Sequence, residues 1–214
     1  MGFESKLAHG ANVTLIGIAL TLTGCSSPEF TNPPPADYLA PPPAAINGTW
    51  ANEEDNGKRV RLLGQKDGTL KLYFSQIKPS ADASPKDPLQ AQTMHFDNTD
   101  WILLDFRKLA AWQGEEPYTE KSPYRLLKYV LETPDRLCGI ELDTGVVAAA
   151  IKTGQLEGKV VASSPLPPQG MGMMASSPGR VMVTSPGDVW VKWWISLPES
   201  GKKFGPKWCF ARAT

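Results

Sequence analysis

The chain has 214 residues, 41% of them hydrophobic, which suits one folded domain with a single core. Its 22 lysines and arginines balance 22 aspartates and glutamates, and no run of like charges forms a tail. Because such a neutral chain has no strong attraction for phosphate backbones, nucleic acid is excluded from the expected partners.

The amino-terminal segment is typical of a signal peptide. Residues 11–22 form an apolar run of about a dozen residues, shorter than the roughly 20 that a membrane-spanning helix needs. Directly after it comes Leu22-Thr23-Gly24-Cys25, an aliphatic residue, two small residues and a cysteine. This tetrapeptide resembles the lipobox of bacterial lipoproteins. The resemblance implies that residues 1–24 are cleaved off and that Cys25 carries a lipid.

A lipid on Cys25 implies a membrane as partner. The lipoprotein resemblance implies a thioether-linked diacylglycerol and usually a further acyl chain on the new amino terminus, and two or three chains anchor durably. Ser26 stands where an aspartate would resemble the inner-membrane retention signal of enteric bacteria. For a Gram-negative source we therefore expect the outer membrane, with the protein facing the periplasm.

Residues 25–47 are expected to carry the lipid and then to serve as a tether. Prolines recur through this stretch, and few of its side chains can be buried, so no core is expected from it. In the polyproline II conformation, at ~3.1 Å per residue, the tether would hold the following domain up to roughly 65 Å from the bilayer.

From residue 48 to 214 short strand-forming runs alternate with turn signals. Three hairpins are predicted, from residues 59–63 with 70–74, 92–96 with 101–106, and 124–131 with 136–142. Further strands are expected at residues 48–52, 159–162, 180–184 and 204–212. The pattern predicts a mainly β domain, an antiparallel meander that closes into a barrel.

Two short helices are expected to interrupt the strands. The first spans residues 143–153, with Asp143 as its N-cap and Gly154 ending it in the left-handed conformation. The second begins at Ser185-Pro186-Gly187-Asp188, a cap followed by proline at the first helical position. Residues 189–195 are also rich in β-branched and aromatic types, so a strand is the alternative there.

If Cys25 carries a lipid, two cysteines remain, Cys138 and Cys209. The periplasm permits disulfides, which predicts a bridge between them. The alternative is two separate thiols, because both residues lie in apolar strand-like runs where a free cysteine behaves as a small hydrophobe.

The start of the first barrel strand, Gly48-Thr49-Trp50, resembles the Gly-x-Trp signature of lipocalins and related calycin barrels. In that family the tryptophan plugs one end of the barrel and a late arginine packs over it. The resemblance implies a lipocalin-like barrel in which Arg212, on the last expected strand, covers Trp50.

No residue pattern indicates catalysis, and no enzyme is expected. His95 is the single histidine after the leader, and no Gly-x-Ser-x-Gly motif accompanies it. One histidine and two separated cysteines do not form a usual zinc site, and no phosphate loop or dinucleotide fingerprint is present. Neither a metal nor a cofactor is expected.

Two apolar groups are candidates for contacting a ligand, a tryptophan cluster and a glycine-methionine stretch. They comprise Trp190, Trp193, Trp194, Met171, Met173 and Met174. Core packing is the alternative for the tryptophans, and a loop with incidental methionines, or Cu(I) binding, for the methionines.

The sequence therefore predicts a lipid-anchored, non-catalytic envelope module that binds an apolar or amphipathic small molecule in its barrel. The alternative is an envelope interaction protein that uses an exposed aromatic face against another protein or peptidoglycan.

Overall fold

The computed structural model of the chain describes residues 27–54, 58–74, 88–113, 123–161 and 179–213. The expected signal peptide, Cys25 and the methionines Met171, Met173 and Met174 lie outside these residues, so their predicted roles stay predictions.

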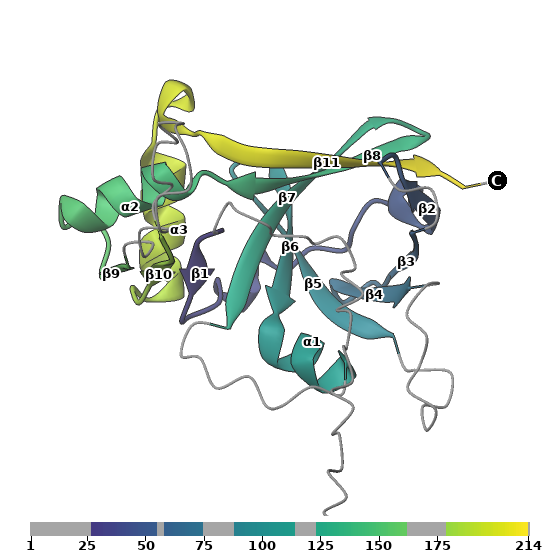
Figure 1. The fold of residues 1–214 in the computed structure, drawn as a ribbon, viewed down its shortest axis with the longest axis horizontal. Coiled ribbons are helices and arrows are strands. Elements are labelled where there is room, and N and C mark those ends of the chain that lie inside the picture. Colours follow the sequence, from purple (N-terminus) through teal and green to yellow (C-terminus); the bar gives the residue numbers. More distant parts are fainter. Residues whose placement is uncertain (1–26, 55–57, 75–87, 114–122, 162–178, 214) are drawn as a thin grey trace, which may run out of the picture.

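In the described part of the chain, eight antiparallel strands close into a barrel, as predicted (Figure 1). The strands are β2 (Gly48–Asn52), β3 (Arg59–Gly64), β4 (Thr69–Phe74), β5 (Leu89–Phe96), β6 (Thr99–Asp105), β7 (Tyr124–Thr133), β8 (Arg136–Leu142) and β11 (Phe204–Arg212). Each strand pairs with its neighbour in this order, and β11 pairs with β2 to close the barrel. All three predicted hairpins are present.

The turn between β5 and β6 is tighter than the expected four residues. Only Asp97 and Asn98 connect the strands, with φ angles of 55° and 50°. A two-residue hairpin needs left-handed backbone at both positions, which Asp and Asn tolerate better than most residues. Local chemistry therefore shortens this turn and extends β6 to Thr99.

A lobe of two helices and three short strands packs against one side of the barrel (Figure 1). It contains α2 (Thr144–Lys152), α3 (Gly187–Ser196), β1 (Glu29–Phe30), β9 (Gly158–Val160) and β10 (Val181–Val183). Both helices were predicted. The side chain of Asp143 accepts a hydrogen bond from the Val146 amide at 2.9 Å, which caps α2.

Two details of the helices differ from the prediction. Helix α3 begins at Gly187 with Pro186 in the N-cap position, because the Ser185 hydroxyl accepts a hydrogen bond from the Glu157 amide instead of capping the helix. Helix α1 (Phe106–Gln113) was not predicted. Its start is fixed by Asp105, whose carboxylate accepts a hydrogen bond from the backbone amide of Arg107 at 3.0 Å.

The prediction of a free tether is wrong for residues 27–47, which pack against the barrel and the lobe. Ser27 to Phe30 are all buried, and so is Ile46. Short 3-10 helices at Ala36–Tyr38 and Ala44–Ile46 shape the rest of the segment. A segment this short needs no core of its own, because a few apolar side chains can join the core of the domain that follows.

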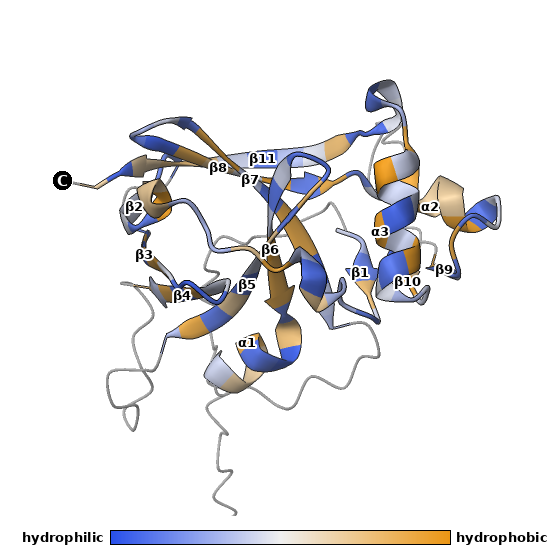
Figure 2. Cartoon of the chain, turned by 180° about the vertical axis from the view of Figure 1, so that it is seen from behind, coloured by the Kyte–Doolittle hydropathy of each residue, from blue (hydrophilic) through white to orange (hydrophobic). Residues whose placement is uncertain are grey.

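Two apolar cores result from alternation along the strands. On β6, Ile102 and Leu104 belong to the core inside the barrel, whereas Trp101 and Leu103 belong to the core between barrel and lobe. Apolar colour accordingly runs through the middle of β6 and recurs along β7 in Figure 2. These strands are buried on both faces, and only the inner face can line a ligand site.

Candidate ligand-binding site

The interior of the barrel holds a cavity of about 140 Å³ with almost entirely apolar walls. Every barrel strand contributes to it. Typical wall residues are Val60, Leu72, Ile102, Leu127, Leu137 and Phe210. Because apolar side chains line this space from all sides, it suits apolar atoms better than water.

Gly139 on β8 is one reason why this space is open. Its inward position carries no side chain, and a Cβ placed there would meet only the Trp208 ring, at 3.9 Å. Any larger residue would extend from this wall into the cavity. The position therefore offers a direct way to fill the cavity by substitution.

Polar side chains gather where the cavity meets the start of β3 and the end of β6. Lys58, Arg59 and Asp105 border it there. Burial alone would raise the pKa of Asp105, but hydrogen bonds from Arg107 outweigh this effect, so the pKa is lowered. Two of these bonds, at 3.0 and 2.9 Å, join the guanidinium to the two carboxylate oxygens, and Asp105 is thereby held ionised and in place.

The opposite end of the barrel is closed by Trp50 and Arg212, as the lipocalin resemblance implied. The Trp50 ring is fully buried, and the Arg212 guanidinium lies 4.4 Å from its centroid. Arg212 also donates hydrogen bonds to the carbonyls of Ala45, Asn47 and Pro134 at 2.7, 3.1 and 2.9 Å. This side chain of β11 thus ties together the segment at residues 45–47 and the turn at Pro134, which cover this end.

Gly48, the glycine of the same motif, is required by this contact. Its φ of 142° is one that residues with a side chain rarely adopt, and an added Cβ would lie 2.6 Å from an Arg212 nitrogen. The Gly-x-Trp pattern therefore has a physical basis in this chain: glycine makes room for the arginine, and tryptophan supplies the surface that the arginine covers.

The structure corrects the assignment of the tryptophan cluster as ligand contacts. Trp190 and Trp194 are each only 2% exposed and pack in the core between barrel and lobe, and Trp193 lies partly buried at its edge. None of the three lines the barrel cavity. Their neighbours fill the space around them, chiefly Phe30, Phe96, Trp101 and Phe204.

A buried polar cluster adjoins the cavity on the wall formed by β7 and β8. Glu141 pairs directly with Leu127, a cavity residue, and one of its carboxylate oxygens has no hydrogen-bond partner. Burial raises the pKa of Glu141, and this rise is only partly offset by the Ser27 hydroxyl and the charge of Arg125. Glu29 binds Arg125 at 2.9 Å in the same cluster.

We expect Glu141 to make stability depend on pH. A carboxyl whose pKa is raised by folding contributes stability that is fully present below its unfolded pKa and is lost as the pH rises through its folded pKa. The variant Glu141→Gln removes this loss. Urea unfolding should therefore show that the variant gains stability relative to the wild type between about pH 4 and about pH 7.5. If the difference in unfolding free energy between variant and wild type is the same at both pH values, the pKa of Glu141 is not raised by folding.

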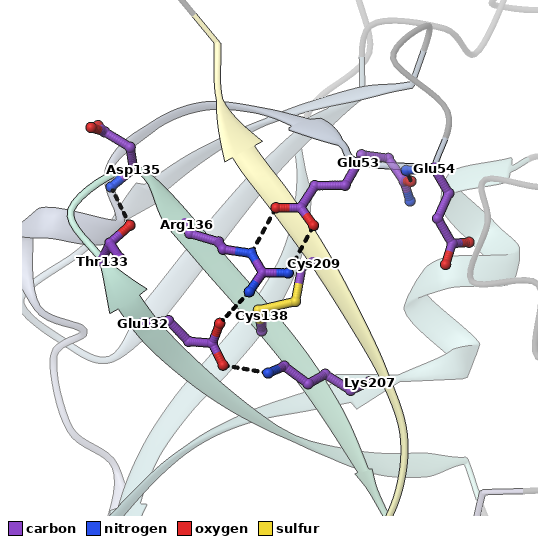
Figure 3. Close-up of polar contacts among 10 residues, drawn as sticks. Glu53, Glu54, Glu132, Thr133, Asp135, Arg136, Cys138, Lys207 and Cys209 are labelled. Atoms are coloured by element: carbon purple, nitrogen blue, oxygen red, sulfur yellow. Dashed lines mark hydrogen bonds and ion pairs between the residues drawn. A yellow bond between two sulfur atoms is a disulfide. The ribbon is translucent and has the colours of Figure 1, made fainter.

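The predicted disulfide between Cys138 and Cys209 is present, on the outer face of the barrel. The two residues lie directly opposite each other on β8 and β11, with their Cα atoms 4.1 Å apart. Figure 3 shows the bridge beneath an ion-pair network. Glu132 lies beside both sulfur atoms, but these are bonded to each other and are not available as thiolate ligands for a metal.

The ion-pair network joins three strands across the bridge (Figure 3). Arg136 binds Glu53 through two contacts of 2.8 and 2.9 Å and Glu132 at 2.6 Å, and Glu132 also binds Lys207. These hydrogen bonds lower the pKa values of Glu53 and Glu132. The group is exposed, so it adds less to stability than the disulfide beneath it.

His95 is exposed, and its Nδ1 lies 2.7 Å from a carboxylate oxygen of Asp100 across the β5–β6 hairpin. It lies at the end of the barrel away from Lys58 and Asp105 and does not line the cavity.

No family model matches the chain, and no match is found among curated proteins or solved structures. None of the described helices combines the length and the apolar character needed to cross a membrane. The fold and the site define the class by themselves: a closed antiparallel barrel of eight strands with an apolar interior cavity.

Proposed function

We propose that the protein is a lipid-anchored envelope lipoprotein whose barrel binds a small apolar or amphipathic molecule. The observation that carries the proposal is the apolar cavity inside the barrel. Residues from every barrel strand line it, and charged side chains border it at one end. The anchor rests on the lipobox, Leu22-Thr23-Gly24-Cys25.

The size of the cavity limits the ligand. Its volume of about 140 Å³ is close to that of an engineered cavity of ~150 Å³ that binds benzene and lies below the ~300 Å³ of the smallest pockets for drug-sized molecules. A single ring or a short alkyl chain therefore suits the cavity. A polar group on such a ligand would lie toward Lys58 and Asp105, where the wall changes from apolar to charged.

Filling the cavity at Gly139 tests this function. We expect the soluble domain to broaden the ¹⁹F NMR signal of 4-fluorotoluene, and we expect Gly139→Leu to abolish the broadening because its side chain occupies the same space. Gly139→Ala is the matched control, since a methyl group fills little of the cavity and should leave most binding intact. Filling a cavity commonly leaves stability unchanged or raises it.

The stability of each variant is measured by urea unfolding, so that loss of binding is separated from loss of fold. Absence of broadening with the wild type, or equal broadening by a well-folded Gly139→Leu, would reject the barrel as the binding site.

A further inference from the structure

Residues 27–30, the first that the structure describes, are buried and held in place by the rest of the domain. Ser27 is 2% exposed, and the residues that follow it are held by several independent contacts. Glu29 binds Arg125 and Arg180, at 2.9 and 2.6 Å, and the Phe30 ring lies 4.5 Å from that of Trp190. No free linker therefore separates the domain from residue 26.

This attachment point lies at the open end of the barrel, by which we mean the end where β2, β4, β6 and β8 finish. Ser27 lies beside Glu141 near the finish of β8, and Arg125, which binds Glu29, lies at the start of β7. The Arg125 guanidinium in turn covers the ring of Phe106, the first residue of α1, at 4.4 Å. Trp50 and Arg212 close the opposite end.

The distance from the lipidation site to this end is short. Two residues of extended chain span at most ~7 Å, so a lipid on Cys25 is held close to Ser27. The membrane surface must then lie near the open end of the barrel. A free tether would instead allow the domain to lie far from the bilayer.

The side chains that α1 and the start of β3 present at the open end suit a lipid surface. Lys58, Arg59 and Lys108 are basic, and Arg59 and Lys108 are exposed. Trp112 on α1 lies partly buried against Phe74, with ring centroids 5.4 Å apart. Lysine and arginine attract anionic headgroups, and tryptophan favours the membrane interface.

We propose that the open end of the barrel rests on the lipid surface of the bilayer that anchors the chain, so that the cavity opens toward the membrane. The proposal depends on the lipid at Cys25, which belongs to the proposed function. Its consequence is that a ligand enters the barrel from the bilayer surface and not from the aqueous phase.

Hydrogen exchange on the lipidated protein tests the orientation. The mature protein is reconstituted into vesicles of phosphatidylethanolamine and phosphatidylglycerol and compared with the soluble Cys25→Ser domain lacking the leader. We expect several-fold slower exchange in the vesicles for residues 58–62 and 106–112. The turns at residues 64–69 and 133–136, at the closed end, should exchange equally in both forms.

A linker variant provides the matched control. A flexible glycine-serine insertion of roughly ten residues between Ser26 and Ser27 restores the free reach of a tether, about 15 to 20 Å on average, and should reduce the protection of α1. Unchanged exchange at the open end in vesicles, or protection at the closed end, would overturn the proposal.

Two further results separate this proposal from the proposed function. Intact-mass analysis that finds no lipid on Cys25 would remove the basis of both the anchor and the orientation. Binding of 4-fluorotoluene by the soluble domain tests the cavity independently of the membrane. If the exchange experiment contradicts the orientation, the proposed ligand site is unaffected, and if binding is absent, the proposed orientation is unaffected.

Discussion

Replacing both Cys138 and Cys209 with alanine is expected to lower the free energy of unfolding by about 4 kcal/mol. The residues are separated by 71 positions, and the bridge closes a loop that contains every element of the lobe except β1. In the chain-entropy description, closing a loop of ~70 residues removes on the order of 4 kcal/mol of conformational freedom from the unfolded state. Urea unfolding of the double variant against the oxidised wild type measures the difference.

The position of the bridge explains why the loss should be large. The polypeptide leaves the barrel after β8, builds α2, β9, β10 and α3, and returns as β11. Strand β11 closes the barrel by pairing with both β8 and β2. Without the covalent link the unfolded chain must bring β11 back to β8 over this long separation before the barrel can close.

Reduction supplies the control for this prediction. Wild-type protein treated with a strong reductant should unfold at nearly the same urea concentration as the double variant, whereas the variant should not respond to the reductant. A wild type whose midpoint is unaffected by full reduction of the bridge would show that strand pairing alone holds β8 and β11 together.

The elements predicted correctly from the sequence are those whose signals are local. Asp67-Gly68 marks one hairpin, and the Asp143 cap together with Gly154 marks both ends of α2. The Cys138–Cys209 pairing followed from counting cysteines once Cys25 was assigned to the lipid. The turn and the helix ends depend on a few neighbouring residues and the bridge on a count of cysteines, so they can be identified without knowledge of the fold.

The elements that were missed depend on contacts between distant parts of the chain. Phe30 belongs to the stretch that was expected to be a tether, yet its ring packs against Trp190, which lies far along the chain. The cavity could not be predicted from the sequence because residues of eight different strands line it. The space left by the missing side chain of Gly139 has no sequence signal beyond a single glycine. The tryptophan cluster was predicted to contact a ligand because of its large apolar area. The same property suits tryptophan to a core.

Trp190→Ala is expected to lower the free energy of unfolding by about 3–5 kcal/mol, as for other large aromatic side chains removed from a core. The Trp190 ring is 2% exposed, packs on Phe30 and Phe96, and its indole nitrogen donates a hydrogen bond to the Asn32 carbonyl at 3.1 Å. Urea unfolding of the soluble domain measures the loss.

Trp193→Ala is the matched control on the same helix. Trp193 is partly exposed and contacts Gln155 through a hydrogen bond of 3.4 Å, so its loss should cost only about 1 kcal/mol. A cost for Trp193→Ala as large as that for Trp190→Ala would contradict the burial that distinguishes the two side chains. Binding of 4-fluorotoluene should be unchanged in Trp193→Ala, because the barrel cavity lies on the other face of the β6–β7 wall. Core packing between barrel and lobe therefore accounts for this helix, and the proposed ligand site is the separate cavity inside the barrel.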